Sequence, residues 1–278
     1  MCIATAGFVT NDVFTKLANA VLPTGEIIAV RGMIGLSLML PFVLYWNGWR
    51  LPGVANRQVL LRSACEAGAA VLYLTALFSM PFANASAIVQ VLPLLITVLA
   101  VLILKEAVGW RRWAAILVGF AGMLLIVKPG MAGFNTYAWI AVIAVGFMSI
   151  RDIISRFIPA TIPSTVATVT TMIVVMLAGF GLSAFEDWQP IDLKHFGLLA
   201  CSAVFVICGN FFMIVAARTA DIGVVAPFRY TVMIWAIAYG LLVWGEFPDT
   251  LALSGTALII LSGLYVFHRE SMAGSRNG

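Results

Sequence analysis

The feature that most constrains this chain is the number of long, continuously apolar segments in it. A helix needs about 20 mostly apolar residues to cross a lipid bilayer, and ten segments meet that requirement, separated by short stretches with Pro and Gly. Because the segments are continuous rather than alternating, they predict helices and not the strands of a barrel. The ten predicted spans cover residues 1–21, 26–48, 59–80, 82–104, 110–128, 136–158, 163–185, 195–217, 222–244 and 250–268.

The low proportion of charged residues excludes a soluble protein of this size. Of the 278 residues, 62% are hydrophobic and 10% are charged, whereas soluble domains carry about 25% charged residues. So few charges cannot cover a soluble surface, which excludes an ordinary cytosolic enzyme, a disordered protein and a fibrous protein. The four cysteines lie in apolar segments without CxxC or His-paired spacing, so we expect no metal site and no cofactor.

The distribution of Lys and Arg predicts the orientation of the chain, because basic residues concentrate on the cytoplasmic side of membrane proteins. If the N-terminus is cytoplasmic, the outer connections hold only Lys128 and Lys194. The inner connections and helix ends then hold Arg50, Arg57, Arg62, Lys105, Arg111, Arg112, Arg151, Arg156, Arg218, Arg269 and Arg276. We therefore predict a multi-pass protein of a bacterial-type inner membrane with both termini in the cytoplasm. We therefore attribute the net charge of +4 to basic residues that set the orientation in the membrane, and not to nucleic-acid binding.

The two halves of the sequence share landmarks at a fixed offset of 140 residues. Residues 11–17 (NDVFTKL) resemble residues 151–157 (RDIISRF), and a Pro and a hydroxyl residue follow each motif at the same distance. The same offset superposes Glu106 on Glu246, each at the end of a long apolar segment. These separated landmarks indicate an internal duplication.

Five predicted spans per repeat is an odd number, which gives the second repeat the opposite orientation. The sequence thus predicts an all-α membrane protein in which ten transmembrane helices form two inverted five-helix repeats around a central cavity. Many secondary transporters that work by alternating access have this arrangement. The repeats are residues 1–134 and 135–270, followed by a short cytoplasmic tail, residues 271–278. A duplication retained only for packing and a channel are the alternatives.

Several stretches carry a resemblance to a known family across essentially the whole chain. They are residues 85–106 and 119–122 in the first half, and residues 226–231, 244–246 and 255–260 in the second. Together with the five-plus-five duplication, they resemble the drug/metabolite transporter superfamily, in particular its EamA-type members, and within these the YddG-like amino-acid exporters. The resemblance implies export of amino acids or other metabolites. Some members of the family instead import cofactors such as S-adenosylmethionine or riboflavin.

Placing a charged residue inside the membrane costs free energy, so such a residue indicates a functional role. Asp12 and Lys16 are four residues apart on one helical face, as are Asp152 and Arg156. Inverted symmetry places one of these pairs near each mouth of a central pathway. Our hypothesis is that the two pairs stabilise alternate gates. The alternative is that each pairs within its own helix near the membrane interface.

Arg229 is the strongest single candidate for contact with a substrate. A guanidinium group binds a carboxylate through two parallel hydrogen bonds, as an amino acid or organic acid would require. The alternative is a structural ion pair with Glu66 or Asp221. Glu66 itself could attract an ammonium group or carry a proton, or it could form a local salt bridge with Arg62.

Other polar side chains have weaker functional signals. Trp235 lies deepest of the tryptophans and could line a cavity or face lipid. Glu26 and Arg31, near the outer surface, and the matched Glu106 and Glu246, at helix ends, favour structural roles. Four neutral groups could line a cavity or bridge helices: Tyr73, Gln90, Asn210 and Tyr230.

Missing motifs narrow the function further. The sequence has no Walker motif, no HExxH zinc pattern, no GxSxG nucleophile elbow and no channel selectivity filter. We therefore expect no enzymatic activity but a monomeric or homodimeric transporter in the lipid bilayer. It would export a small-molecule substrate, an amino acid or a related metabolite, driven by the substrate gradient or by exchange with a proton. The candidate proton carriers are Asp12, Glu66 and Asp152. The alternatives are a cofactor importer, a membrane-embedded enzyme and a channel.

Overall fold

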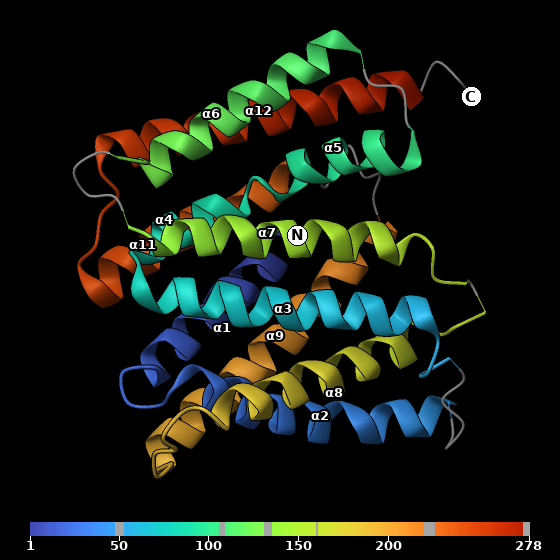
Figure 1. The fold of residues 1–278 in the computed structure, drawn as a ribbon, viewed down its shortest axis with the longest axis vertical. Helices are drawn as coiled ribbons and strands as arrows, with labels where there is room; N and C mark the ends of the chain where they lie inside the picture. The colour runs from blue at the N-terminus through green and yellow to red at the C-terminus, as the bar shows by residue number, and fades with distance from the viewer. Residues whose placement is uncertain (48–52, 106–108, 131–134, 160, 220–225, 275–278) are drawn as a thin grey trace.

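The computed structural model describes residues 1–47, 53–105, 109–130, 135–159, 161–219 and 226–274, and every regular element within these ranges is helical (Figure 1). Glu106 and Asp221 lie outside these ranges. The α-helices are α1 (Cys2–Ala18), α2 (Thr24–Asn47), α3 (Arg57–Ser79), α4 (Phe82–Val89), α5 (Leu92–Leu104), α6 (Trp110–Val127), α7 (Tyr137–Ser155), α8 (Ser164–Ser183), α9 (Leu193–Thr219), α11 (Val232–Tyr239) and α12 (Thr250–Gly274). A 3-10 helix, η1 (Ala226–Thr231), precedes α11, and a π-helix, η2 (Gly240–Trp244), follows it.

Seven helical segments within the described residues are long and apolar enough to cross a membrane. Two further apolar helices, Phe228–Trp244 and Thr250–Val266, are shorter. Helix α1, which covers the first predicted span, belongs to neither group, because Asn11, Asp12 and Lys16 interrupt its apolar sequence. The structure therefore agrees with a multi-pass helical membrane protein, while the count of ten spans stays a prediction.

Two of the predicted spans are broken rather than continuous. Residues 90 and 91 form a turn between α4 and α5, just before Pro93 in the first turn of α5. Proline cannot donate a backbone hydrogen bond, so it is tolerated in the first turn of a helix and disfavoured in the interior of a continuous one. The second break begins at η1, which contains Pro227. The two breaks lie at equivalent positions of the two halves, since Gln90 and Tyr230 are 140 residues apart.

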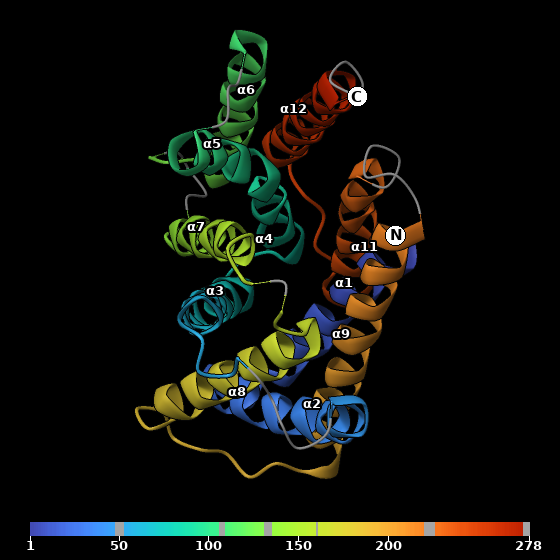
Figure 2. The ribbon, with the colours of Figure 1, turned by 90° about the vertical axis from the view of Figure 1, so that its right-hand side faces the viewer.

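The most extensive helix contacts all join the first half of the chain to the second. Helix α3 packs on α7, α1 on α9, α2 on α8 and α6 on α12. At an offset of 140 residues, the helices α1, α2, α3 and α6 are equivalent to α7, α8, α9 and α12. The α3–α7 contact is therefore equivalent to the α9–α1 contact, and the α2–α8 and α6–α12 contacts each join two equivalent helices. In Figure 2, α3, α4 and α7 lie on one side of the molecule and α1, α9 and α11 on the other.

The α6–α12 pair, at one edge of the bundle in both views, shows why small residues recur at equivalent positions. A Cβ atom on Gly122 would lie 2.7 Å from the carbonyl oxygen of Gly255, and one on Gly255 would lie 2.4 Å from the carbonyl oxygen of Gly122. The two backbones therefore touch at this level, which only glycine permits. Close approach through small residues is the usual way in which helices associate within a membrane.

Candidate functional site

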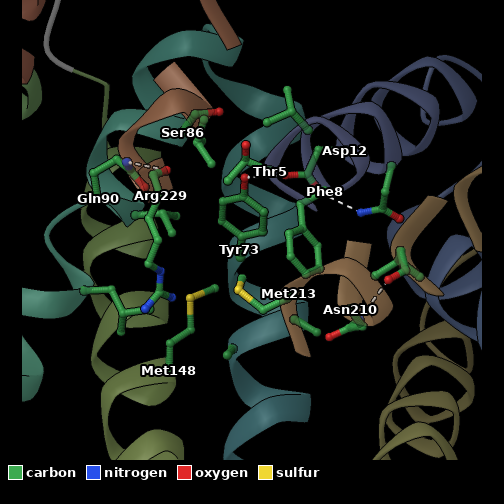
Figure 3. Close-up of a pocket in the computed structure, with 18 of the residues that line it drawn as sticks. Thr5, Phe8, Asp12, Tyr73, Ser86, Gln90, Met148, Asn210, Met213 and Arg229 are labelled. Atoms are coloured by element: carbon green, nitrogen blue, oxygen red, sulfur yellow. Dashed lines mark hydrogen bonds between the residues drawn. The ribbon is translucent and has the colours of Figure 1, made fainter. Parts of the chain in front are cut away.

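A cavity of about 470 Å³ lies between the two halves, at the level of the two helix breaks. Its lining comes from α1, α2, α3, α7 and α9, together with both broken segments (Figure 3). Its volume falls within the range of about 300–1,000 Å³ that is typical of small-molecule sites. Transporters commonly bind their substrates at discontinuous helices near the interface of the repeats, so this cavity is the candidate site.

Arg229 reaches this cavity from η1, and Figure 3 shows its guanidinium group beside Met148. Its backbone carbonyl oxygen accepts a hydrogen bond of 3.5 Å from Nε2 of Gln90, which bridges the two broken segments. Within the described parts of the chain, the guanidinium group itself makes no hydrogen bond and no ion pair. The alternative of a structural pair with Glu66 is therefore wrong, because Glu66 pairs with Arg151.

Asp12 faces the cavity from α1, where neutral groups hold its carboxylate. The hydroxyl of Tyr73 donates a hydrogen bond of 2.8 Å to one oxygen, and Nδ2 of Asn11 donates one of 2.9 Å to the other. The amide oxygen of Asn11 in turn accepts hydrogen bonds of 3.1 Å from Arg31 and 2.7 Å from Ser202. No ion pair joins Asp12 to Lys16, so the predicted pairing within this helix is wrong.

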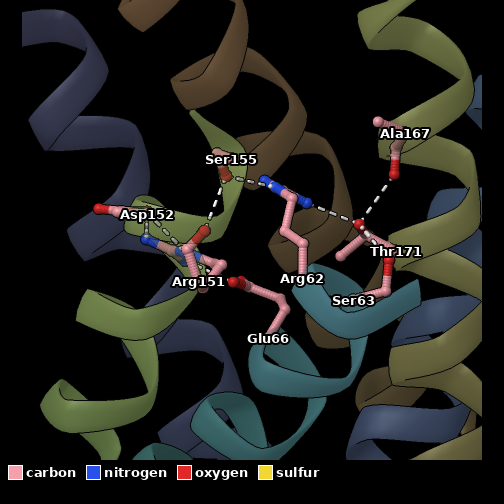
Figure 4. A network of polar contacts seen from close by, with 8 residues as sticks. All are labelled: Arg62, Ser63, Glu66, Arg151, Asp152, Ser155, Ala167 and Thr171. Atoms are coloured by element: carbon pink, nitrogen blue, oxygen red, sulfur yellow. Dashed lines mark hydrogen bonds and ion pairs between the residues drawn. The ribbon is translucent and has the colours of Figure 1, made fainter. Parts of the chain in front are cut away.

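A network of charged residues lines the cavity from α3 and α7 (Figure 4). The Arg151 guanidinium forms ion pairs with Glu66 and with Asp152, the latter at 2.7 Å. Arg62 donates hydrogen bonds of 3.0 Å to the Ser155 hydroxyl and 2.7 Å to the hydroxyl of Thr171 on α8. The local Arg62–Glu66 bridge that the spacing predicts is therefore replaced by bonds between helices.

The charges around the cavity are mixed in sign, with a small positive excess. Seven ionisable side chains of Arg, Asp and Glu line it, four of them positive and three negative: Arg31, Arg62, Arg151, Arg229, Asp12, Glu66 and Asp152. Such a lining complements a solute that carries a carboxylate together with a cationic group. It does not suit a purely apolar or a strongly cationic solute.

A packed layer of aromatic and charged side chains joins α1, α4 and η2. The Phe82 side chain is fully buried and stacks on Trp244, with ring centroids 5.2 Å apart. Nζ of Lys16 donates a hydrogen bond of 2.7 Å to the carbonyl oxygen of Met80 and lies 5.1 Å from the Trp244 ring. The Glu246 carboxylate accepts a hydrogen bond of 3.0 Å from the backbone N–H of Phe82, at the start of α4.

Three predicted site residues lie outside the lining of the cavity, and a fourth, Tyr230, lines it while its hydroxyl group points to another helix. Lys16 belongs to the packed layer of Phe82 and Trp244 and does not line the cavity, and Arg156 is exposed outside the lining. Trp235 is 37% exposed and also lies outside the lining, because its neighbours Met233 and Ala236 form the buried face of α11. Tyr230 lines the cavity, but its hydroxyl group points at Gly263 of α12, where a Cβ atom would lie 1.6 Å away.

The remaining predicted residues line the cavity. The Asn210 amide donates a hydrogen bond of 2.8 Å to the Val206 carbonyl oxygen of its own helix, and its side chain is labelled at the cavity wall in Figure 3. The residues of the predicted set that line the cavity are Asp12, Glu66, Tyr73, Gln90, Asp152, Asn210, Arg229 and Tyr230.

Three arginines that line the cavity were absent from the predicted site residues: Arg31, Arg62 and Arg151. Arg31 was expected near the outer surface in a structural role, and Arg151 only as a basic residue that sets orientation. The repeat contained a signal for both. At the offset of 140 residues, Arg151 falls on Asn11, and Arg31 falls on Thr171, and both of these residues belong to the polar networks around the cavity.

Comparison with known proteins gives similar sequences over nearly the whole chain. The EamA-like transporter family matches it twice, over residues 1–128 and 135–267. The S-adenosylmethionine uptake transporter of Rickettsia prowazekii (strain Madrid E) is 27% identical, over 94% of this chain and 88% of its own length. The pseudopaline exporter CntI of Pseudomonas aeruginosa (strain UCBPP-PA14) is 26% identical, over 94% and 92%.

Two more similarities come from a further transporter and from a solved structure. The riboflavin transporter of Vibrio cholerae serotype O1 (strain ATCC 39315 / El Tor Inaba N16961) is 27% identical, over 92% of this chain and 86% of its own length. A crystal structure with 19% sequence identity has a TM-score of 0.60 and covers 95% of this chain and 96% of its own, which shows a shared fold. The three sequence relatives are transporters of small molecules.

Proposed function

The chain belongs to the EamA-like transporter family, and we propose that it is a secondary transporter that exports a small zwitterionic metabolite, foremost an amino acid. The observation that carries this proposal is the Arg229 guanidinium, which faces three carboxylates across one cavity and has no partner within the described residues. An arginine without a counter-ion is costly where it is shielded from water. Its presence is explained when a substrate supplies the missing anion.

In this proposal Arg229 binds the substrate carboxylate. The planar guanidinium group offers two parallel donors that match the two carboxylate oxygens, and such charge-assisted bonds are the strong ones. The side chain projects from the short 3-10 helix at the second break, and its backbone oxygen is tied to Gln90 at the first break. Movement of either broken segment would therefore alter the position of the carboxylate site.

The opposite wall of the cavity provides for the cationic group of the substrate. Glu66 and Asp152 both form ion pairs with Arg151, whereas Asp12 accepts its hydrogen bonds from the neutral Tyr73 and Asn11. An ionised carboxylate has about four acceptor positions, so Asp12 retains capacity for an ammonium group. For the same reason, Asp12 is the foremost of the three proposed proton carriers if a proton is exchanged.

Alternating access explains how such a cavity would serve export. The exchange of helix pairs under the 140-residue shift supports two inverted repeats, residues 1–134 and 135–270, with both termini in the cytoplasm. In that orientation the layer of Lys16, Phe82 and Trp244 closes the outer end of the cavity. We assign this layer as the outer gate, which rocking of the two repeats would open.

Import of a cofactor is the second candidate function. It is favoured by the names of two relatives, an S-adenosylmethionine uptake transporter and a riboflavin transporter. S-adenosylmethionine carries the amino and carboxylate groups of an amino acid, so Arg229 and Asp12 would bind it in the same way. Riboflavin has no carboxylate, and its transport would leave Arg229 without an anion.

The test is counterflow into proteoliposomes that contain the purified full chain. Unlabelled substrate is loaded inside, and uptake of labelled amino acids, S-adenosylmethionine and riboflavin is measured with and without a pH gradient. Saturable uptake that is stimulated by internal substrate is expected for a zwitterion. The amine that remains after decarboxylation of the same amino acid should neither enter nor compete.

The outcomes separate the candidates. Uptake of S-adenosylmethionine or riboflavin with no uptake of any amino acid would favour the cofactor importer. Equal competition by an amino acid and by its decarboxylated amine would overturn the carboxylate site at Arg229. Flux that rises linearly with concentration and shows no stimulation from inside would indicate a channel and contradict the carrier.

A further inference from the structure

A second cavity, of about 420 Å³, lies between α6 and α12 on the outside of the bundle. It begins beyond the level where Gly122 and Gly255 bring the two helices into backbone contact. From there it extends along Ala114 of α6 and Leu261 of α12 toward the start of α6. In Figure 2 these two helices lie at one edge of the molecule.

The distance from the helix crossing to the open end suits a lipid chain. Trp110 precedes Gly122 by 12 residues, and Tyr265 follows Gly255 by 10, so the groove is about 15–18 Å long at the helical rise of 1.5 Å per residue. Leu261 is 64% exposed and Trp110 is 75% exposed. In a membrane, these apolar surfaces face acyl chains and not water.

The open end of the groove carries a cation beside an aromatic ring. The Arg111 guanidinium lies 5.5 Å from the centroid of the Trp110 ring, and Tyr265 lines the same cavity from α12. The Tyr265 hydroxyl has no hydrogen-bond partner in the parts of the chain that the structure describes. Trp and Tyr side chains are favoured at the level of lipid headgroups, and basic pockets between helices on the cytoplasmic side bind anionic headgroups.

We propose that this groove, defined by Trp110, Arg111, Ala114, Leu261 and Tyr265, is a binding site for one anionic phospholipid of the cytoplasmic leaflet. Arg111 would bind the phosphate, with the Tyr265 hydroxyl as a second donor, and an acyl chain would lie along Ala114 toward the helix crossing. The charge of Arg111 selects an anionic lipid over a zwitterionic one. The site is separate from the central cavity and does not depend on which substrate is transported.

The experiment is native mass spectrometry of the full-length protein, released from detergent micelles that contain either phosphatidylglycerol or phosphatidylcholine. The wild-type protein should retain phosphatidylglycerol in preference. Arg111→Gln should reduce this preference about fivefold, the effect of one basic residue at a membrane surface. Arg57→Gln removes an exposed arginine at the start of α3, on the same predicted side but outside the groove, and should leave the preference unchanged.

A second variant tests the groove without changing charge. Ala114→Phe fills the space between the helices and should reduce the retention of phosphatidylglycerol as well. Equal losses in Arg111→Gln and Arg57→Gln would overturn the proposal, since lipid would then respond to overall charge. A dimeric wild-type protein that Ala114→Phe makes monomeric, with unchanged lipid retention, would instead assign the groove to a second copy of the chain.

Discussion

Single residues decide which part of a substrate each wall of the central cavity could recognise. Arg229 and Asp12 both face this space, yet their surroundings differ, since Asp12 accepts two hydrogen bonds and the Arg229 guanidinium makes none within the described residues. A charged group with an unfilled hydrogen-bonding capacity can form charge-assisted hydrogen bonds to a group of the opposite charge on a substrate. The first two predictions therefore concern these two side chains.

Replacement of Arg229 should weaken binding of a carboxylate-bearing substrate. Hydrogen bonds to charged groups contribute about 1.5–3 kcal/mol, so Arg229→Gln should raise the KM for counterflow about tenfold to a hundredfold. Arg229→Lys keeps the charge but not the paired donors, and its KM should lie between those of the wild type and Arg229→Gln. Equal kinetics in all three proteins would exclude Arg229 from substrate binding.

Replacement of Asp12 should affect the opposite group of the substrate. Asp12→Asn removes the negative charge while it keeps the size of the side chain, so the KM for an amino acid should rise about tenfold, as the loss of one charged hydrogen bond implies. Inhibition of counterflow by the matching acid without its amino group should not change. The control Tyr73→Phe removes one donor to Asp12 and should have a smaller effect. Loss of inhibition by the deaminated acid would contradict the separate roles.

The sequence predicted which residue types would line the cavity better than it predicted their partners. An intramembrane charge is visible in the sequence by itself, and Asp12, Glu66, Asp152 and Arg229 all line the cavity. Their partners depend on which helices are neighbours. The spacing of four residues favoured pairing within one helix, but contact of α3 with α7 places Arg151 beside Glu66 instead.

At the scale of helices, hydropathy does not reveal where one helix ends and the next begins within an apolar segment. A hydropathy window averages over about 20 residues, so it merges α4 with α5 and does not register the turn at residues 90–91. Pro93 and Pro227 were visible in the sequence but were read only within continuous spans. The breaks that they accompany supply a large part of the cavity lining.

The contact between Glu246 and the start of α4 should hold the outer gate closed. Glu246→Gln keeps the shape but loses the charge that favours the N–H groups at a helix N-terminus. A cysteine introduced at the buried, cavity-lining Ser86 should then react faster with a membrane-impermeant maleimide added from outside, in a background without native cysteines.

A matched control for this gate exists in the chain. The Glu186 carboxylate accepts a hydrogen bond of 2.8 Å from the backbone N–H of Gly25, at the start of α2, and it does not line the cavity. Glu186→Gln removes a similar contact on the same predicted side and should leave the labelling of the introduced cysteine unchanged. Equal acceleration by both variants would show a general loosening rather than an opened gate.

Asp249 should stabilise the start of α12 in a pH-dependent way. Its carboxylate accepts a hydrogen bond of 2.8 Å from the backbone N–H of Ala252 and pairs with Lys128 at the end of α6. The Lys128 ammonium group, followed by the Ala252 N–H, holds the pKa of Asp249 below its usual value. Its stabilisation is therefore present at neutral pH and is lost as the pH falls below the ordinary range of an aspartate.

The measurement is thermal unfolding in detergent. Asp249→Ala should lower the free energy of unfolding by about 1 kcal/mol at neutral pH, as loss of a helix cap does. The difference from the wild type should shrink in strong acid. Asp187→Ala, in the exposed connection between α8 and α9, is the control and should not change stability. A difference that persists unchanged in acid would contradict the role of the ionised carboxylate.

At the scale of the whole molecule, the proposed orientation makes a prediction for topology. Single cysteines at Arg57 and Asp187, both exposed, should lie on opposite sides of the membrane in a cysteine-free background. Asp187→Cys should react with an impermeant maleimide in intact cells, and Arg57→Cys only after the cells are permeabilised. The opposite result would invert the molecule and move the proposed lipid site to the outer leaflet.

The general architecture was predictable because long apolar segments and a repeated motif are properties of the sequence alone. The packing partners were not, since contacts such as Phe82 with Trp244 depend on which helices become neighbours in the fold. These contacts join residues more than 160 positions apart, and no local pattern around Phe82 indicates its partner.

The pairing of helices across the duplication has a consequence for biosynthesis. Because α1, α2, α3 and α6 each have their main packing partner in the second half, the first half alone encloses no core. When residues 1–128 have been translated and inserted into the membrane, the main packing partners of their helices have not yet been translated. In the proposed inverted arrangement, an ancestor with a single repeat would have needed a second copy inserted in the opposite orientation, and the duplicated gene encodes both copies in one chain.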